Sequence, residues 1–121
     1  MKLTIDRSKW HRGRGGVMSY LLSHYDGKMC CLGFLALACG VPKDMIRGIR
    51  SPLGLANRSG SLPEPMQFLV NEARYSPTTG HTTAALFLVG TNDDCGITDE
   101  QREAALSTCF RANGIEPEFV N

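Results

Sequence analysis

Two adjacent cysteines carry the most reactive side chains in this sequence. Cys30 and Cys31 follow Lys28 at the start of an apolar run that is expected to be helical. A cysteine beside a cation at a helix N-terminus can have a lowered pKa and act as a nucleophile. His24 and His81 are the candidate general bases. One hypothesis is therefore a cysteine hydrolase that uses Cys30 or Cys31 with His81 or His24.

The sequence around these cysteines argues against a hydrolase, so we keep this function as an alternative to a binding protein. Cys31-Leu32-Gly33, with Gly80-His81 further along, is similar to the cysteine and histidine segments of NlpC/P60-type cysteine peptidases, but that family's serine after the cysteine is missing. The chain also has no Cys-x-x-Cys or His-x-x-x-His pair, and adjacent cysteines point apart on a helix or a strand. We therefore expect no metal site, no cofactor and no enzyme activity.

An arginine–glycine segment offers a second kind of chemistry, the binding of phosphate. Arg12 and Arg14 alternate with Gly13, Gly15 and Gly16. Guanidinium groups pair with phosphate oxygens, and the amides of a flexible glycine loop can cradle an anion. The segment matches neither the P-loop nor the dinucleotide-binding fingerprint, so a solvated loop is the alternative interpretation.

The polar run Asn92-Asp93-Asp94 could complete such a site. Aligned with a calcium-binding EF-hand loop by its glycine, this region has Thr91 at the first ligand position and Arg102 where the bidentate carboxylate belongs, so the calcium motif fails. The run is typical of hydrogen-bonded turns, and it could also contact the sugar or base of a ligand, with a second protomer bringing it there. The predicted ligand-binding residues are Arg12, Arg14, Lys28, Asn92 and Asp93.

Positive charge is concentrated in the first half of the chain. Residues 1–60 carry ten Lys and Arg against three acids, whereas residues 61–121 carry three against nine, so the halves are about +7 and −6 although the net charge is +1. Either the fold mixes these charges on its surface, or a basic face lies opposite an acidic one and could pair protomers head to tail as a homo-oligomer. The near-neutral total argues against generic nucleic-acid binding.

Length and composition indicate one domain, residues 1–121. No segment approaches the roughly 18 apolar residues of a membrane span, and the first residues lack the apolar stretch of a signal peptide. The five cysteines are an odd number set among apolar residues, which fits a reducing compartment. We therefore expect a cytoplasmic protein with reduced cysteines, of which Cys95 in its glycine-flanked turn is the most reactive.

The elements that must position these residues form an α+β fold. Strands are predicted at Lys2–Asp6 and over residues 115–120, and a hairpin at the Asp26-Gly27 turn, which together make a small antiparallel sheet. Helices are predicted over 28–39, 65–74, 84–89 and 98–111, the last with a Thr98–Gln101 capping box, and one helical turn over 43–47. Residues 29–32 could instead complete the hairpin, and residues 84–89 could be a strand, although their Ala-Ala-Leu start favours a helix. Residues 51–63, rich in Gly, Ser, Pro and Asn, are predicted to be a loop. The sheet is expected to pack against three to four helices around a core that includes Leu3, Ile5, Leu32, Leu35, Leu37, Leu69, Leu86, Leu106, Phe110 and Phe119.

With these segments placed, the chain resembles short uncharacterised accessory proteins encoded by tailed bacteriophages. The likeness lies in Lys2 to Arg7, in Asp26 to Gly33 with its Cys-Cys-Leu-Gly core, in the Asn-Asp turn at 92–94 and in Glu118-Phe119-Val120. The resemblance implies a phage accessory role in the host bacterial cell and supplies no mechanism. The expected function is a binding protein that antagonises host defence, by sequestering an anionic nucleotide signal or by blocking a defence protein.

Overall fold

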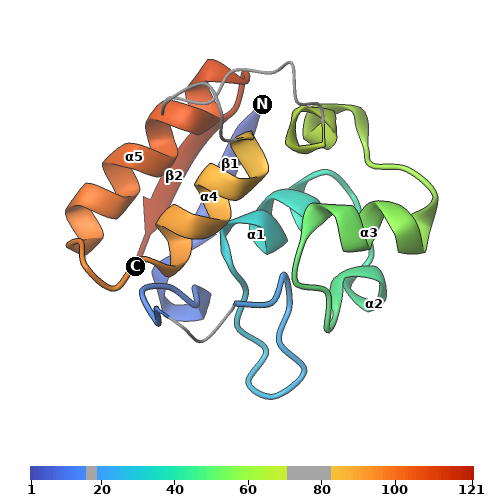
Figure 1. The fold of residues 1–121 in the computed structure, drawn as a ribbon, viewed down its shortest axis with the longest axis horizontal. Coiled ribbons are helices and arrows are strands. Elements are labelled where there is room, and N and C mark those ends of the chain that lie inside the picture. The colour runs from blue at the N-terminus through green and yellow to red at the C-terminus, as the bar shows by residue number, and fades with distance from the viewer. Residues whose placement is uncertain (16–18, 71–82) are drawn as a thin grey trace.

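A two-stranded parallel sheet joins the two ends of the chain in a computed structural model that describes residues 1–15, 19–70 and 83–121 (Figure 1). Strand β1 (Lys2–Asp6) pairs with β2 (Glu116–Val120) in a register that sets Leu3 opposite Pro117 and Ile5 opposite Phe119. Side chains alternate along a strand, so Leu3 and Ile5 share one face, and both are fully buried. The predicted positions of both terminal strands are confirmed.

The predicted antiparallel sheet with a hairpin is not confirmed. Within the described residues the sheet contains only β1 and β2, which run parallel. The chain does turn at residues 24–26, but the backbone groups of the two arms also bond outside the turn. The N–H of Leu21 donates to the carbonyl of Ile49, and the N–H of Met29 donates to that of Lys9. Because other segments occupy these groups, the arms form no strand ladder.

Helices form where the sequence predicts them, with shifted bounds. The apolar run after the turn begins its helix at Cys31, and the glycine at position 40 follows with a φ of 86°. The Thr98–Gln101 capping box is present as predicted. The predicted segment 65–74 is a 3-10 helix in its described part, and its residues 71–74 lie outside the described residues. The bounds are α1 (Cys31–Ala38), α2 (Lys43–Ile46), η2 (Glu64–Leu69), α4 (Ala84–Asp93) and α5 (Asp99–Ala112), with a short 3-10 helix η1 (Arg7–Lys9) after β1.

The prediction of a loop over residues 51–63 is wrong, because α3 (Pro52–Ser59) is a helix. The Ser51 hydroxyl accepts a first-turn backbone N–H at 3.2 Å, and a proline occupies the first helical position. Gly60, with a φ of 89°, ends the helix in the left-handed conformation. Ser51, Pro52 and Gly60 thus begin and end a helix instead of forming a loop. Leu55 is fully buried and packs this helix against the core.

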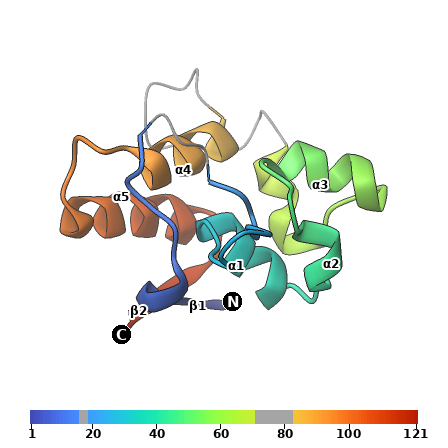
Figure 2. The ribbon, with the colours of Figure 1, turned by 90° about the horizontal axis from the view of Figure 1, so that it is seen from below.

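The helices pack in two layers over one side of the sheet. Helix α1 contacts β1, α5 contacts β2, and α4 contacts both α1 and α5. Figure 2 shows the sheet below, α1 and α5 in the middle and α4 above, with α2 and α3 beside α1. Most of the predicted core is buried, but Leu86 is 65% exposed, and Leu37 and Phe119 are only partly buried. The apolar run around Leu86 predicts that it is buried, yet Leu86 lies on the outer side of α4.

Candidate anion-binding site

Three of the residues predicted to bind a ligand line one pocket. Arg12 and Arg14 come from the loop after η1, and Lys28 comes from the segment before α1. The pocket has a volume of about 350 Å³, near the lower end of the range for small-molecule sites. The residues that complete its lining are Trp10, His11, Gly13, Cys95, Ile97, Asp99 and Arg102.

The loop that follows η1 and carries Arg12 and Arg14, residues 10–15, is here called the arginine loop, and the end of α4 holds it in place. The N–H of Gly13 donates to the carbonyl of Asn92 at 2.8 Å, and the N–H of Gly15 donates to that of Asp93 at 2.7 Å. Gly13 and Gly15 have φ values of 69° and 61°, which residues with a Cβ rarely adopt. These two amides therefore bind α4, so the site differs from the amide cradle that the sequence predicted. A ligand would therefore be bound by the cationic side chains of the loop and not by these two amides.

Arg102 is a cationic residue of the pocket that the sequence analysis did not assign. Its side chain is only 3% exposed, and its Nη1 donates to the carbonyls of Thr91 at 2.8 Å and Asp94 at 2.7 Å. These carbonyls lie at or beside the C-terminal end of α4, where a cation is favoured. The φ of 69° at Gly13 disfavours any side chain, and a Cβ there would also lie 2.9 Å from Arg102 Nη2 and push it aside. In the sequence, Arg102 is notable only because it occupies the position where a calcium-binding loop would need a carboxylate. No local sequence pattern indicates that it caps the C-terminal end of α4.

Arg12 is also held in place by its neighbours, although less tightly than Arg102. Its guanidinium lies 4.5 Å from the centre of the Trp10 ring, and its Nη1 donates to the carbonyls of Arg7 and Trp10, each at 3.1 Å. Its Nε lies 3.4 Å from an oxygen of Asp99, which is an ion-pair distance. Within the described residues, however, the buried Arg12 Nε and the buried Nδ1 of His11 have no hydrogen-bond partner. Each such group costs about 1–3 kcal/mol, so these two buried atoms lower the stability of the fold.

Arg14 and Lys28 are the cations with the most freedom. Arg14 is exposed and Lys28 is half-buried. In the described part of the chain, neither side chain forms an ion pair, whereas Arg12 and Arg102 share the carboxylate of Asp99. Both residues line the pocket, so their charges are available to an anion that enters it.

Asn92, predicted to contact a ligand, is fully buried beneath the pocket. Its Oδ1 accepts from Trp10 Nε1 at 2.7 Å and from the backbone N–H of Cys31 at 3.0 Å. Its Nδ2 donates to the carbonyl of His11 at 3.0 Å and to Asp93 Oδ1 at 2.9 Å. These bonds use the two acceptor positions and the two donors of the amide. In this structure Asn92 supports the walls of the pocket and has no group left for a ligand.

Asp93 also belongs to the support of the loop. Its Oδ1 accepts from the hydroxyl of Ser19 at 2.6 Å, and its backbone carbonyl receives the N–H of Gly15. Both Asn92 and Asp93 reach the arginine loop within one chain, so this contact needs no second protomer. Neither residue lines the pocket with Arg12, Arg14 and Lys28.

The cysteines of the alternative hypothesis are buried rather than activated. Burial raises the pKa of Cys30 to about 11 and raises that of Cys31 well above its ordinary value. A nucleophilic cysteine needs the opposite shift, because the thiolate is the reactive form. His24 is exposed and packs against Tyr25, with ring centres 4.2 Å apart. His81, the other candidate base, lies outside the described residues.

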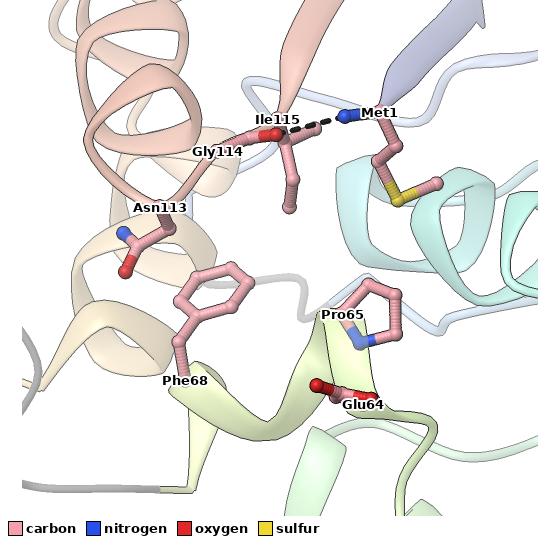
Figure 3. Close-up of a pocket in the computed structure, with 7 residues that line it drawn as sticks. All are labelled: Met1, Glu64, Pro65, Phe68, Asn113, Gly114 and Ile115. Atoms are coloured by element: carbon pink, nitrogen blue, oxygen red, sulfur yellow. Dashed lines mark hydrogen bonds between the residues drawn. The ribbon is translucent and has the colours of Figure 1, made fainter.

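A separate pocket lies beside the beginnings of β1 and β2, as Figure 3 shows. It has a volume of about 340 Å³ and lies between Met1, η2 and the turn that joins α5 to β2. The amino nitrogen of Met1 donates to the carbonyl of Gly114 at 2.9 Å, and the ring of Phe68 faces the same space. In the described residues its lining includes the carboxylate of Glu64 and the amino group of Met1 but no Lys or Arg, so it holds fewer cations than the arginine-lined pocket. This pocket therefore suits an anion less well than the arginine-lined pocket.

The described residues contain neither a metal-binding cluster nor a membrane-spanning helix. Over residues 1–15, 19–70 and 83–121, no group of three or more His, Cys, Asp and Glu residues is placed to hold a metal ion. No helix in this part of the chain is both long enough and apolar enough to cross a membrane.

No protein-family model, curated protein or solved structure matches the chain.

Proposed function

We propose that the protein binds a small phosphate-bearing ligand, a nucleotide, in the pocket lined by Arg12, Arg14 and Lys28. One observation supports this most strongly: cations from two separate segments converge on a single polar pocket. Buried Arg102 adds a further positive charge, and among the described residues of the lining only Asp99 is acidic. Phosphate oxygens are recognised by such groups, and a charge-assisted hydrogen bond contributes about 1.5–3 kcal/mol.

Asp99 gives the proposed site an internal competitor. Its carboxylate lies 3.4 Å from the Nε atoms of both Arg12 and Arg102, and it is more than half exposed. An entering phosphate would share these guanidinium groups with Asp99 or displace it from them. The carboxylate should therefore weaken anion binding while it contributes to the charge balance of the empty pocket.

The biological setting is part of the proposal and comes from the resemblance to phage accessory proteins. A protein of that kind that binds a nucleotide would antagonise host defence by sequestering an anionic signal. No covalent step is required, since binding alone lowers the free concentration of the signal. Blockade of a host defence protein is the alternative, and the binding experiment separates the two.

Calorimetry against linear and cyclic nucleotides at two salt concentrations tests the proposal. Arg14→Ala should weaken binding about tenfold or more, because an exposed cation with no ion pair in the described structure is lost. Asp99→Asn should strengthen binding, because it removes the competing carboxylate. Arg58→Ala is the matched control, since Arg58 is an exposed arginine on α3 that does not line the pocket. Higher salt should weaken binding.

Arg12 is a poor first variant, because it also stacks on Trp10 and bonds two backbone carbonyls. Equal affinity for wild type and Arg14→Ala would place the ligand elsewhere. Absence of binding to every nucleotide, with a host protein retained in pull-downs from infected cells, would replace nucleotide sequestration by protein blockade.

A further inference from the structure

We infer that the arginine pocket is one half of a longer site, and that an adjoining pocket receives the base of the nucleotide. This inference rests on the proposed function, because it names the part of the ligand that a phosphate pocket leaves unbound. The observation behind it is that Lys28 lines both pockets. Lys28 therefore places one cation at the edge of both hollows.

The second pocket, here called the base pocket, has an apolar floor. Its volume is about 440 Å³. Met29 and Phe34 are more than 90% buried, and Leu37 on the outer part of α1 is partly buried. An apolar floor with polar groups around it is the usual form of a small-molecule site. The lining residues are Asp6, Ser8, Lys9, Leu22, Asp26, Gly27, Lys28, Met29, Phe34, Leu37 and Lys43.

The two pockets flank the same pair of backbone segments. Residues 9–11 run beside Met29, where the N–H of His11 donates to the Met29 carbonyl at 2.8 Å and the N–H of Met29 donates to the Lys9 carbonyl at 3.0 Å. Residues 10–14 contribute to the arginine pocket, whereas Lys9 and residues 26–29 contribute to the base pocket. Short backbone bonds thus keep the two pockets adjacent, with Lys28 common to them.

The polar groups of the base pocket suit a nucleoside. A base is flat and can lie on apolar side chains, while its amino groups and the ribose hydroxyls need acceptors. Asp6 and Asp26 supply carboxylates, and the Lys28 backbone N–H lowers the pKa of Asp26, which keeps it an ionised acceptor. Lys9 and Lys43 form no ion pair within the described residues. Inorganic phosphate would leave all of these groups unused.

The first arm of the test compares ligands that differ by one part. Calorimetry with pyrophosphate, ribose 5-phosphate, adenosine monophosphate and a cyclic dinucleotide separates the contributions of phosphate, sugar and base. We expect each nucleotide to bind at least about tenfold more tightly than ribose 5-phosphate, because the base covers apolar surface.

The second arm compares variants of the two pockets. Leu37→Gln and Lys43→Ala should each weaken nucleotide binding about fivefold and leave pyrophosphate binding unchanged. Arg14→Ala should weaken both ligands. Lys2→Ala is the matched control for Lys43→Ala, because Lys2 is also exposed and lines neither pocket. Thermal melts verify that each variant is folded, and Lys43 is exposed enough that its variant should be.

The outcomes distinguish this inference from the proposed function. If ribose 5-phosphate and nucleotides bind equally well, and Leu37→Gln and Lys43→Ala change neither, the base pocket is not part of the site although the phosphate pocket stands. If neither pyrophosphate nor any nucleotide binds the wild-type protein, the proposed function fails and the inference fails with it. If the Leu37 and Lys43 variants weaken only the nucleotides, the two-part site is supported.

Discussion

The five cysteines differ mainly in their access to solvent. Cys95 is exposed and Cys39 is partly exposed, whereas Cys30, Cys31 and Cys109 are buried. Burial raises the pKa of Cys39 and raises those of Cys30 and Cys109 to about 11. A buried thiol is hard to reach and is also mostly protonated at neutral pH. Cys95, which lines the arginine pocket, is therefore the cysteine that should react first.

Thiol labelling of the native protein at pH 7.5, roughly neutral, measures this order. The fast phase should correspond to Cys95 and disappear in Cys95→Ser, while Cys39 should follow more slowly. Cys39→Ser is the matched control, because it should leave the fast phase intact. Labelling of Cys30 or Cys31 as fast as that of Cys95 would contradict the burial of α1 and revive the nucleophile hypothesis.

The same burial predicts a loss of stability in alkaline solution. In the unfolded chain a thiol ionises near its ordinary pKa of 9.0, whereas the native fold keeps Cys30 and Cys109 protonated up to about 11. The unfolded state therefore binds fewer protons in this range, and the free energy of unfolding falls as the pH rises. Thermal melts from pH 8 to 11, about the range of these two values, should show a smaller fall for Cys109→Ala than for wild type.

Between elements, α1 is joined very closely to the segment before it. A Cβ on Gly33 would overlap the backbone carbonyl of Leu21, so only a glycine allows this approach. The same helix is buried from Cys31 to Ala36. The glycine of the Cys-Cys-Leu-Gly core therefore has a packing role. The two cysteines are core residues at the start of α1, with Cys30 as its N-cap and Cys31 as its first residue.

Asn92 connects three elements, and its replacement should test whether it has a structural role. It lies in α4, bonds the N-terminal amide of α1 and holds Trp10 of the arginine loop. In Asn92→Ala two buried donors lose their acceptor, so the free energy of unfolding should fall by about 2–4 kcal/mol. Urea denaturation followed by Trp10 fluorescence measures it.

Asn57→Ala is the matched control for this variant, because Asn57 is exposed on α3. Its effect should stay within about 0.5 kcal/mol. If Asn92→Ala kept its full stability but lost nucleotide affinity, Asn92 would instead be the ligand contact that the sequence predicted.

For the whole molecule, the pairing of the two chain ends closes the fold. Strand β2 pairs with β1 along its edge. This pairing places Phe119 against Trp10, with ring centres 5.3 Å apart. Ile115, just before β2, is 2% exposed. The strand also packs against α5, so it links the sheet with the middle layer of helices. The end of the chain is thus connected to the loop that carries Arg12.

Deletion of residues 115–121 should abolish cooperative unfolding. The truncated chain loses the partner of β1, buried Ile115 and the contact of Phe119 with Trp10, which together should cost several kcal/mol, comparable with the total stability of a small domain. Differential scanning calorimetry measures the transition. Deletion of Asn121 alone is the control, because it removes only an exposed hydrogen bond to Asp6. A cooperative melt in the longer deletion would show that β2 is dispensable.

The sequence alone was enough for features that depend on neighbouring residues. The Thr98–Gln101 capping box, the glycine end of α1 and the alternation of Leu3 and Ile5 were predicted, because each is decided within a few residues. Residue type likewise marked Arg12, Arg14 and Lys28 as cations suited to phosphate, although their role as ligands stays a prediction. Helix α3 was missed because its cap residues are also common in loops.

Tertiary structure decided the features that join distant segments. The parallel direction of β1 and β2, the burial of Asn92, the helix-capping position of Arg102 and the sharing of Lys28 between two pockets depend on contacts across most of the chain. Asn is a residue type that is common in turns, so the sequence predicts Asn92 to lie in one. Its amide oxygen accepts hydrogen bonds from Trp10 and Cys31 only when α1, α4 and the arginine loop have packed together. Hydrogen bonds and burial of this kind are properties of the packed elements, so no local sequence pattern specifies them.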